Sequence, residues 1–587
     1  MSEAIAAGLR AFVEELVRAG MMEVVICPGS RSTPMALALA AHDDLRVHVL
    51  LDERSAAFAA LGMARVARRP VAVLVTSGTA AAELLPAAAE ANLARVPLLL
   101  LTADRPAELR DRGAAQTIDQ LGIFGSHVRW AAEVPLMDGA PATLAHWRWL
   151  AGRAMAEAGG VGRAAGPVHL DLPYREPLVP EGPLGPEPDL AGAPFLRVIG
   201  GVRMLAEPDL DGLAARLRSV EHGLIVCGPG DDPSLAFAVR VLSSATGYPI
   251  LSDGLAEVRA DRITGGADHL LRPGPWLDAH LPDLIIRTGA IPTARPMLEL
   301  VARDGHELWV IDGDGGWRQP AARPATLLHA DPTATLLALA RRCAADPPAW
   351  RGGTWGAAWS KADFEVSVAL GQWLADLDEP FEGLPFDLLR SVVTERTLLW
   401  VGSSMPVRDL GAWFGGSPSI RAVASRGANG IDGVTSAAAG AAAVHDGPVV
   451  LVTGDVSFVH DLGALVTARL LSVALTVVVI DNDGGGIFSF LAQATTDRPD
   501  VGLPERFEQL FGTPHGTRIA DAAAALGANV REVDHRSLEP ALRAAIADRS
   551  PGVRLLRYAT DRRRNVGLHA QAAQVAADAL ARLANAP

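Results

Sequence analysis

The sequence predicts an α/β protein of three domains, each an open parallel sheet flanked by helices. Three observations lead to this fold. Strand-sized runs of apolar residues recur along the chain, and most end in a turn rich in Gly, Ser, Asp or Pro before a helical stretch. The runs are apolar without alternation, which is typical of parallel strands that helices cover on both faces. The length of 587 residues leaves room for several buried cores.

The first third of the chain alternates regularly between helices and strands. Residues 2–19 form an amphipathic pattern that ends at Gly20, and an Ala-rich helix is expected behind Thr79. Strands are predicted at residues 24–27, 47–51, 71–76 and 96–102. Because open parallel sheets bind ligands at the carboxyl ends of their strands, the polar residues that follow each strand are the candidates for function.

Two Pro-rich stretches divide the remainder. The segment from Pro173 to Pro194 has the composition of an extended linker, and Asp346-Pro347-Pro348 marks a second boundary. Further strands are predicted at residues 224–227, 284–287 and 308–311, and then at 398–401, 448–453, 475–480 and 553–558. We therefore expect an N-terminal domain at residues 1–185, a central domain at 195–345 and a C-terminal domain at 360–587.

Composition excludes several classes of protein. Lys and Arg number 53 against 67 Asp and Glu, and the net charge of −14 disfavours an electrostatic grip on nucleic acid or on an anionic membrane. Cys27, Cys227 and Cys343 are far apart in the sequence, which disfavours a disulfide framework or a structural zinc site. No apolar run is long enough to span a membrane, and the first residues do not suit a secretory signal. We expect a cytoplasmic protein without nucleic-acid or membrane partners.

Two turns of the last third carry metal-binding chemistry. Gly454-Asp455-Val456-Ser457 follows the strand at 448–453, and Asp481-Asn482-Asp483-Gly484-Gly485-Gly486 follows the strand at 475–480. Asp455 and Asn482 are 27 positions apart, the length of one β-α-β crossover, so both side chains can lie at the same edge of the sheet. Oxygen ligands with room for phosphate suit Mg²⁺ bound to a diphosphate. Either turn alone is ordinary capping chemistry, but the two at this spacing favour a metal site.

This pair of turns resembles the cofactor motif of the thiamine-dependent decarboxylase superfamily. The resemblance implies that Asp455, the side chain of Asn482 and the carbonyl of Gly484 bind Mg²⁺ (or Mn²⁺). The superfamily has Asn-Asn where this chain has Asp481-Asn482, which adds a carboxylate near the site. The resemblance further implies that thiamine diphosphate is bound by Glu53, Ser77, Gly78, Thr79, Ser403, Ser404, Met405, Ile431, Gly454, Asp455, Val456, Ser457, Asn482, Gly484, Gly485, Gly486, Ile487 and Phe488.

The resemblance also assigns the catalytic residue. Superfamily members take a Glu from the end of an N-terminal-domain strand, facing the diphosphate-binding domain of the partner subunit, to favour the imino tautomer of the aminopyrimidine ring. Glu53 occupies such a position in Leu51-Asp52-Glu53-Arg54-Ser55. Ile431 matches the bulky apolar residue that keeps the cofactor bent. Taken alone, Glu53 is interpreted as a surface residue at a helix N-terminus and Ile431 as a core residue.

Four arginines near strand ends suggest the substrate. They are Arg31 in Cys-Pro-Gly-Ser-Arg-Ser-Thr-Pro, Arg105 in Thr-Ala-Asp-Arg-Pro, Arg408 behind Ser404-Met405, and Arg426 in Ser-Arg-Gly-Ala-Asn-Gly. A single arginine of this kind more often forms a surface ion pair. Four around one cofactor favour a pocket for several carboxylates, because guanidinium groups bind carboxylates in bidentate fashion.

These segments, with Gly-Ala-Ala-Gln at 113–116 and Asn-Asp-Gly-Gly-Gly-Ile-Phe at 482–488, resemble the 2-succinyl-5-enolpyruvyl-6-hydroxy-3-cyclohexene-1-carboxylate synthase family (MenD family), over about residues 20–495. The resemblance implies decarboxylation of 2-oxoglutarate and 1,4-addition of the succinyl carbanion equivalent to isochorismate, releasing CO₂, in menaquinone biosynthesis. It implies a homodimer or homotetramer with active sites between subunits. The implied substrate residues are Ser30, Arg31, Arg105, Gln116, Ser404, Arg408 and Arg426, with Arg295 where the family tends to have a Lys.

Two alternatives stay open at the level of sequence. The first is another thiamine-diphosphate enzyme, an acetolactate synthase or a 2-oxoacid decarboxylase, that consumes one 2-oxoacid without isochorismate. The second is a nucleotide-binding regulatory or scaffold protein on a Rossmann-like sheet. The chain has no convincing G-x-G-x-x-G after a strand and no G-x-x-x-x-G-K-[ST], which disfavours the second alternative.

Overall fold

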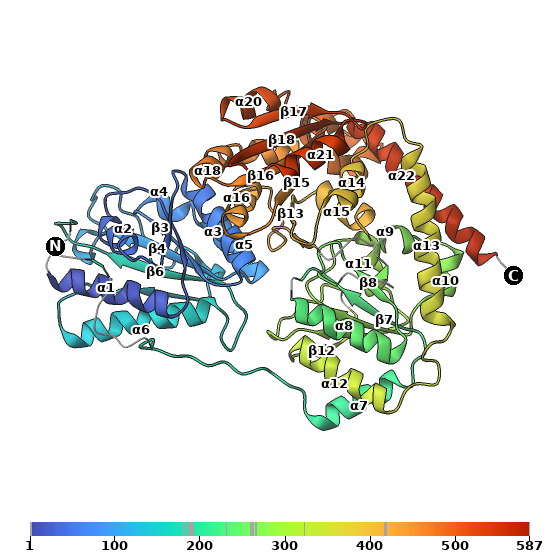
Figure 1. Ribbon diagram of the computed structural model, residues 1–587, viewed down its shortest axis with the longest axis horizontal. Helices are drawn as coiled ribbons and strands as arrows, with labels where there is room; N and C mark the ends of the chain where they lie inside the picture. Colours follow the sequence, from blue (N-terminus) through green and yellow to red (C-terminus); the bar gives the residue numbers. More distant parts are fainter. Residues whose placement is uncertain are drawn as a thin grey trace.

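The computed structural model describes residues 3–179, 181, 184–185, 193–230, 232–258, 263–264, 267–321, 323–415 and 420–585. It has three parallel sheets of six strands, each flanked by helices, so the predicted fold class is confirmed (Figure 1). Part of the predicted linker, at residues 180, 182–183 and 186–192, lies outside the described residues. No helix among the described residues has the length and apolar character needed to cross a membrane.

The N-terminal sheet has the strand order β2-β1-β3-β4-β6-β5. Its inner strands are buried along their whole length, as their apolar sequences require, since helices cover both faces. The strands are β1 (Glu23–Ile26), β2 (Arg46–Val49), β3 (Val71–Val75), β4 (Leu98–Asp104), β5 (Trp130–Glu133) and β6 (Pro167–Pro173). The helices are α1 (Glu3–Arg18), α2 (Thr33–Ala40), α3 (Glu53–Ala67), α4 (Thr79–Ala82), α5 (Leu85–Ala94) and α6 (Pro141–Ala158).

The central sheet has the strand order β12-β11-β10-β7-β8-β9. An extended stretch without helix or strand at residues 193–206 leads into it (Figure 1). The strands are β7 (Gly223–Cys227), β8 (Ile250–Ser252), β9 (Ile263–Thr264), β10 (Leu284–Thr288), β11 (Glu307–Ile311) and β12 (Thr326–Leu328). The helices are α7 (Glu207–Leu217), α8 (Pro233–Thr246), α9 (Ala267–Leu270), α10 (Pro275–Ala279), α11 (Arg295–Ala302) and α12 (Pro332–Ala345).

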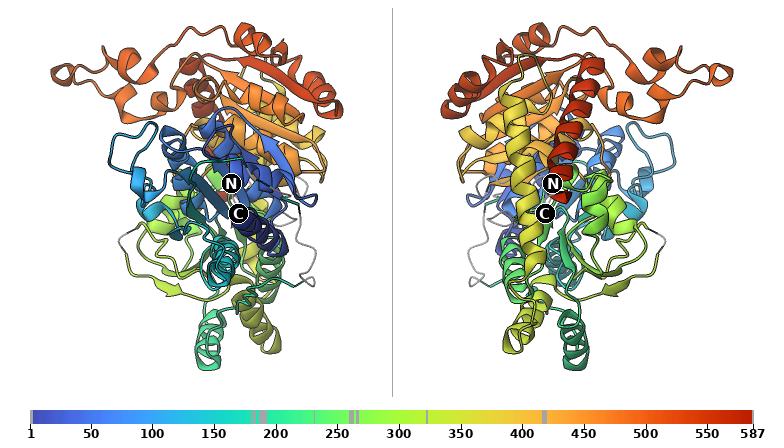
Figure 2. Two further views of the ribbon diagram at one scale, coloured as in Figure 1. Left: turned by 90° about the vertical axis from the view of Figure 1, so that its left-hand side faces the viewer. Right: turned by 90° about the vertical axis from the view of Figure 1, so that its right-hand side faces the viewer.

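The C-terminal sheet has the strand order β14-β13-β15-β16-β18-β17. The strands are β13 (Leu398–Val401), β14 (Arg421–Val423), β15 (Val449–Gly454), β16 (Ala474–Asp481), β17 (Asn529–Val533) and β18 (Gly552–Ala559). The helices are α13 (Thr354–Ala375), α14 (Leu384–Val392), α15 (Met405–Trp413), α16 (Val434–Val444), α17 (Asp455–His460), α18 (Ala464–Leu470), α19 (Ala492–Thr495), α20 (Ile519–Ala525), α21 (Leu538–Ala547) and α22 (Arg562–Ala584). The long helices α13 and α22 pack side by side (Figure 2).

The N- and C-terminal domains are joined by a close crossing of α3 and α16. A Cβ atom at Gly62 on α3 would lie 1.9 Å from the carbonyl oxygen of Ala437 on α16. Reciprocally, a Cβ atom at Gly440 on α16 would lie 1.9 Å from the carbonyl oxygen of Ala59. Glycine at these two positions therefore lets the two backbones touch. The helix that begins at Glu53 is thereby held against the C-terminal domain of its own chain.

Candidate functional site

Asp455 lies where the sequence spacing places it, beside the turn that follows β16. Strands β15 and β16 are parallel neighbours, with Gly454 opposite Ile480, so the residues after each strand meet at one edge. The Asp455 carboxylate is 2% exposed. Its Oδ2 accepts hydrogen bonds from the backbone N–H groups of Gly484 (2.8 Å) and Asn482 (3.2 Å). Burial and the neighbouring Asp481 raise the pKa of Asp455, so a bound cation would stabilise its ionised form.

Asn482 and Gly484 complete an oxygen-rich corner. The side-chain Oδ1 of Asn482 is buried and has no hydrogen-bond partner within the part of the chain that the structure describes. Gly484 has φ of +142°, and a Cβ atom there would lie 2.0 Å from the carbonyl oxygen of Gly512, so only glycine fits this turn. A buried amide oxygen without a donor, a carboxylate and a tight glycine turn fit a hard divalent cation. Asp455, Asn482 and Gly484 would hold it.

Two further side chains approach the same corner. Ligand atoms of Asp455, Asp481 and His515 lie within 4.8 Å of one another. The extra carboxylate expected from Asp481 is therefore near the site, and its Oδ2 accepts a hydrogen bond from Arg557 Nε at 2.6 Å. His515 Nε2 lies 3.4 Å from Asp455 Oδ2, while its Nδ1 accepts from Thr517 N–H at 3.0 Å. The sequence offered no spacing signal for His515.

The other cofactor residues predicted in the C-terminal domain surround these turns. Ser457 Oγ donates a hydrogen bond to the carbonyl of Ile431 at 2.9 Å, which joins the Ile431 segment to α17. Ser403 Oγ donates to the carbonyl of Ser425 at 3.3 Å, at the start of α15. The remaining members lie at or shortly after the ends of β13, β15 and β16: Ser404, Met405, Gly454, Val456, Gly485, Gly486, Ile487 and Phe488.

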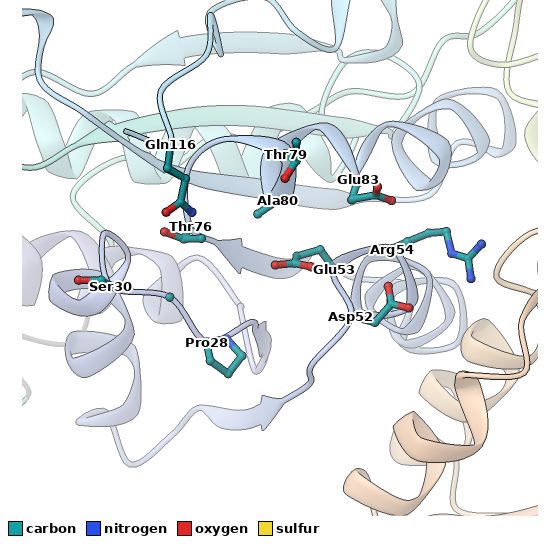
Figure 3. Close-up of a pocket in the computed structure, with 11 residues that line it drawn as sticks. Pro28, Ser30, Asp52, Glu53, Arg54, Thr76, Thr79, Ala80, Glu83 and Gln116 are labelled. Carbon is teal, nitrogen blue, oxygen red and sulfur yellow. The ribbon is translucent and has the colours of Figure 1, made fainter. Parts of the chain in front are cut away.

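Glu53 lines a separate pocket in the N-terminal domain, with a volume of about 660 Å³ (Figure 3). Glu53 is the first residue of α3, and Asp52 caps this helix by accepting a hydrogen bond from Ser55 N–H at 3.1 Å. Of the predicted residues, Ser30, Thr79 and Gln116 also line the pocket. All of its lining residues belong to the N-terminal domain: Pro28, Gly29, Ser30, Asp52, Glu53, Arg54, Thr76, Thr79, Ala80, Glu83 and Gln116. This pocket and the metal corner are thus formed by different domains.

Ser77, Gly78 and Gln116 form one hydrogen-bonded turn beside this pocket. Ser77 Oγ donates to the carbonyl of Gln116 at 3.0 Å, and Gln116 Nε2 donates to the carbonyl of Ser77 at 2.9 Å. Gly78 has φ of +84°, and its N–H donates to Gln120 Oε1 at 2.9 Å. The turn after β3 is therefore rigid before any ligand binds.

The four predicted arginines form two groups, and the N-terminal group is Arg31 with Arg105. Arg31 is buried; its Nη1 donates to the carbonyl of Tyr174 at 2.9 Å, and its Nη2 pairs with Glu176 at 3.2 Å. Arg105 donates to Ser77 Oγ. Burial and then the nearby charge of Arg31 lower the pKa of Arg105, as expected where two cations lie close together.

The C-terminal group is Arg408 with Arg426. Arg408 donates to the carbonyl of Ser404. Burial and then Arg408 lower the pKa of Arg426, so a second pair of cations shares one environment. Such pairs favour anionic ligands, because each cation gains from a shared carboxylate.

The loop after Arg426 is held from the other domain. The carboxylate of Glu90 on α5 accepts hydrogen bonds from the N–H groups of Gly427 at 2.8 Å and Ala428 at 2.6 Å. Sequence reasoning did not single out Glu90, since it lies inside an Ala-rich helix.

Arg295 lies apart from these groups. It begins α11 in the central domain, its side chain is 77% exposed, and its Nε pairs with Glu299 one helical turn away at 2.7 Å. The structure thus brings Arg31 near Arg105 and Arg408 near Arg426, but it gives Arg295 a surface ion pair.

Comparison with known proteins identifies the family. Residues 7–123 match the thiamine pyrophosphate enzyme, N-terminal TPP binding domain, and residues 415–556 match the corresponding C-terminal TPP binding domain. A 2-succinyl-5-enolpyruvyl-6-hydroxy-3-cyclohexene-1-carboxylate synthase of Chloroflexus aurantiacus is 42% identical over 590 residues, covering 99% of this chain and 97% of the relative. Synthases of the same name from Myxococcus xanthus (40%, covering 95% of each chain) and Geobacillus thermodenitrificans (39%, covering 97% and 96%) are also similar.

The chain belongs to the 2-succinyl-5-enolpyruvyl-6-hydroxy-3-cyclohexene-1-carboxylate synthase family. The predicted family and cofactor, thiamine diphosphate with a divalent metal, are thereby confirmed. The similarity extends beyond the motif-bearing residues 20–495 to nearly the whole chain. The match to the N-terminal TPP binding domain includes Glu53, and the match to the C-terminal TPP binding domain includes Asp455 and Asn482.

Proposed function

We propose that this chain decarboxylates 2-oxoglutarate and adds the succinyl unit by 1,4-addition to isochorismate. The products are 2-succinyl-5-enolpyruvyl-6-hydroxy-3-cyclohexene-1-carboxylate and CO₂, in menaquinone biosynthesis. The observation that carries this proposal is the 42% identity, over 99% of the chain, to a synthase of that name. The two arginine pairs support these substrates, because each substrate carries two carboxylates and guanidinium groups bind carboxylates.

The metal corner anchors the cofactor in this proposal. Asp455, Asn482 and Gly484 bind the cation, and the cation binds the diphosphate. Thiamine diphosphate, when bound, supplies the carbanion chemistry that decarboxylation of a 2-oxoacid requires. At the metal corner, the chain itself fixes the positions of the oxygen ligands. Asp455 accepts hydrogen bonds from three backbone N–H groups, which hold its carboxylate in place.

Glu53 is the residue that we assign to exchange a proton with the aminopyrimidine ring. The pocket around it supports this role, because Glu53 projects into a space large enough for a small organic ring. Gln116, which also lines this pocket, is held in place by its two hydrogen bonds with Ser77.

We propose that the working enzyme is a homodimer or homotetramer. The pocket at Glu53 is lined by N-terminal-domain residues, and the metal corner is formed by the C-terminal domain. A second subunit that brings its C-terminal domain to this pocket would complete the site, and symmetry would create two such sites.

The test is a substrate comparison with purified protein, thiamine diphosphate and Mg²⁺. CO₂ release is measured from 2-oxoglutarate and from pyruvate, each with and without isochorismate. We expect 2-oxoglutarate to be consumed and isochorismate to accelerate its turnover. Preference for pyruvate, with no response to isochorismate, would overturn the substrate assignment in favour of an acetolactate-synthase-like or simple decarboxylase activity.

A further inference from the structure

One buried carboxylate outside the predicted set touches the metal corner. Glu382 lies in the loop between α13 and α14 and is 1% exposed. Its Oε1 accepts a hydrogen bond from Asn482 Nδ2 at 2.9 Å and another from Thr560 Oγ1 at 3.1 Å. Its backbone N–H donates to Asn565 Oδ1 at 3.3 Å, which ties the loop to α22.

The contact matters because an amide side chain has two unlike ends. A metal ion binds the amide oxygen of Asn, whereas the NH₂ group carries hydrogens and repels a cation. A rotation of the Asn482 amide by half a turn would exchange the two. In the observed arrangement the NH₂ group is bound to Glu382, and Oδ1 is left buried without a partner within the described part of the chain.

Glu382 Oε1 remains an acceptor in either ionisation state of the carboxyl group. It receives two donors, one from Asn482 and one from Thr560, so a proton on the carboxyl group would reside on Oε2. The amide orientation is therefore fixed by geometry and does not depend on the charge of Glu382.

Other contacts confine Asn482 further. A Cβ atom at Gly486 would lie 2.5 Å from Asn482 Nδ2, so the amide packs directly on that glycine. The backbone carbonyl of Asn482 accepts a hydrogen bond from Arg562 Nε at 3.1 Å. With its backbone and its NH₂ group both held, Asn482 has one polar side-chain atom left to bind a ligand, the oxygen.

We propose that Glu382 is a positioning residue, which binds the Asn482 amide so that its oxygen and not its nitrogen faces the metal. This inference rests on the metal site in the proposed function. Partners that orient metal ligands typically affect metal affinity by about 10- to 100-fold.

The test measures thiamine diphosphate binding by calorimetry over a series of Mg²⁺ concentrations, which needs no turnover. Glu382→Met, whose thioether sulfur is only a weak acceptor, should raise the Mg²⁺ concentration for half-maximal binding by about 10- to 100-fold. Glu382→Gln, whose carbonyl can still accept from Asn482, should stay within about threefold of the parent protein. Thr560→Val is the matched control, because it removes the other donor to Glu382 and leaves the Asn482 contact; it should also stay within about threefold.

A carboxylate in place of the amide makes the prediction sharper. The two oxygens of a carboxylate are equivalent, so in an Asn482→Asp background Glu382→Met should cost no Mg²⁺ affinity. In the same background Glu382→Gln should improve Mg²⁺ affinity. It removes the repulsion between the carboxylates at positions 482 and 382 and supplies an amide N–H that can donate to the carboxylate at position 482. This second comparison decides the matter if Glu382→Met does not fold in the parent background.

The outcomes separate the inference from the site on which it rests. If Asn482→Ala leaves the Mg²⁺ dependence unchanged, the metal assignment itself is wrong. If Asn482→Ala weakens binding but Glu382→Met binds like the parent, only the positioning role is wrong. Equal losses for Glu382→Met in the parent protein and in the Asn482→Asp background would also overturn that role.

Discussion

The crossing of α3 and α16 allows one mutation to be predicted in magnitude as well as in sign. In Gly62→Ala, the new methyl group would lie 1.9 Å from the carbonyl oxygen of Ala437, whereas ordinary contact begins at 3.4 Å. The two helices must therefore separate by about 1.5 Å. Neither backbone can yield by a rotamer change, because the obstructing atom belongs to the main chain.

The expected cost follows from two opposing contributions. Overpacking a buried contact costs about 1–3 kcal/mol, and the loss is at the upper end here because backbone meets backbone. The higher helix propensity of Ala offsets about 1 kcal/mol of that loss. The net destabilisation is about 2 kcal/mol, which corresponds to a fall of roughly 4–8 °C in the Tm of domains of this size.

Gly371→Ala is the matched control. Gly371 lies within α13, and a Cβ atom there has no neighbour within 4 Å. The same substitution at this position should raise the free energy of unfolding by about 0.5–1 kcal/mol. Scanning calorimetry at one fixed scan rate compares the three proteins. If the Tm of Gly62→Ala equals or exceeds the Tm of Gly371→Ala, the reasoning about the crossing of α3 and α16 is refuted.

Four further predictions concern the site and the pH dependence of stability. Glu53→Gln should bind the cofactor but lose at least about 100-fold in kcat, measured by CO₂ release; normal turnover would mean that the proton-exchanging group lies elsewhere. Asp455→Ala should weaken Mg²⁺ and thiamine diphosphate binding together in calorimetry, and unchanged affinity for either would contradict the ligand assignment. Arg408→Ala should raise KM for a dicarboxylate substrate about 10-fold or more while cofactor affinity stays constant. A larger loss of cofactor affinity than of substrate affinity would mean that Arg408 binds the cofactor and not the substrate. Burial raises the pKa of Asp461 to about 6, so between about pH 4 and 6 the unfolded chain loses a proton that the folded chain keeps. The free energy of unfolding should therefore fall by about 3 kcal/mol as the pH rises through this range. Denaturant titrations at several pH values should show that Asp461→Asn removes this pH dependence. If the free energy of unfolding of Asp461→Asn follows the same pH dependence as that of the parent protein, Asp461 is not responsible.

Most interior strands of the three sheets were predictable, and most of the unpredicted strands lie at sheet edges. Edge strands β5, β12 and β17 are short and partly exposed, so their sequences carry no continuous apolar signal. Strands β6 and β8 are interior exceptions: β8 has only three residues, and β6 is buried yet contains His169 and Asp171. In the structure Thr102 Oγ1 lies 2.8 Å from His169 Nε2 and donates to Asp171 Oδ1 at 2.9 Å. Cross-strand bonding of this kind makes a polar strand stable in a core, and no local pattern reveals it.

The same limit applies to the site. Asp455 and Asn482 were predictable because strand pairing converts sequence spacing into proximity. Glu382 and His515 reach the same corner through loops far away in sequence, and nothing around either residue signals the contact. Motif-based reasoning therefore finds the residues that follow strands and misses those that support them.

The hydrogen bonds from Gly427 and Ala428 to Glu90 have a consequence for how two subunits would associate. They order an arginine-bearing loop inside a single chain, before a neighbour is present. Association then need not immobilise that loop, so the conformational entropy lost on assembly is smaller and more of the interface free energy appears as affinity. In the homodimer or homotetramer that we propose, each subunit would therefore bring its Arg426 loop already ordered, and separation of the subunits on dilution would leave this loop ordered.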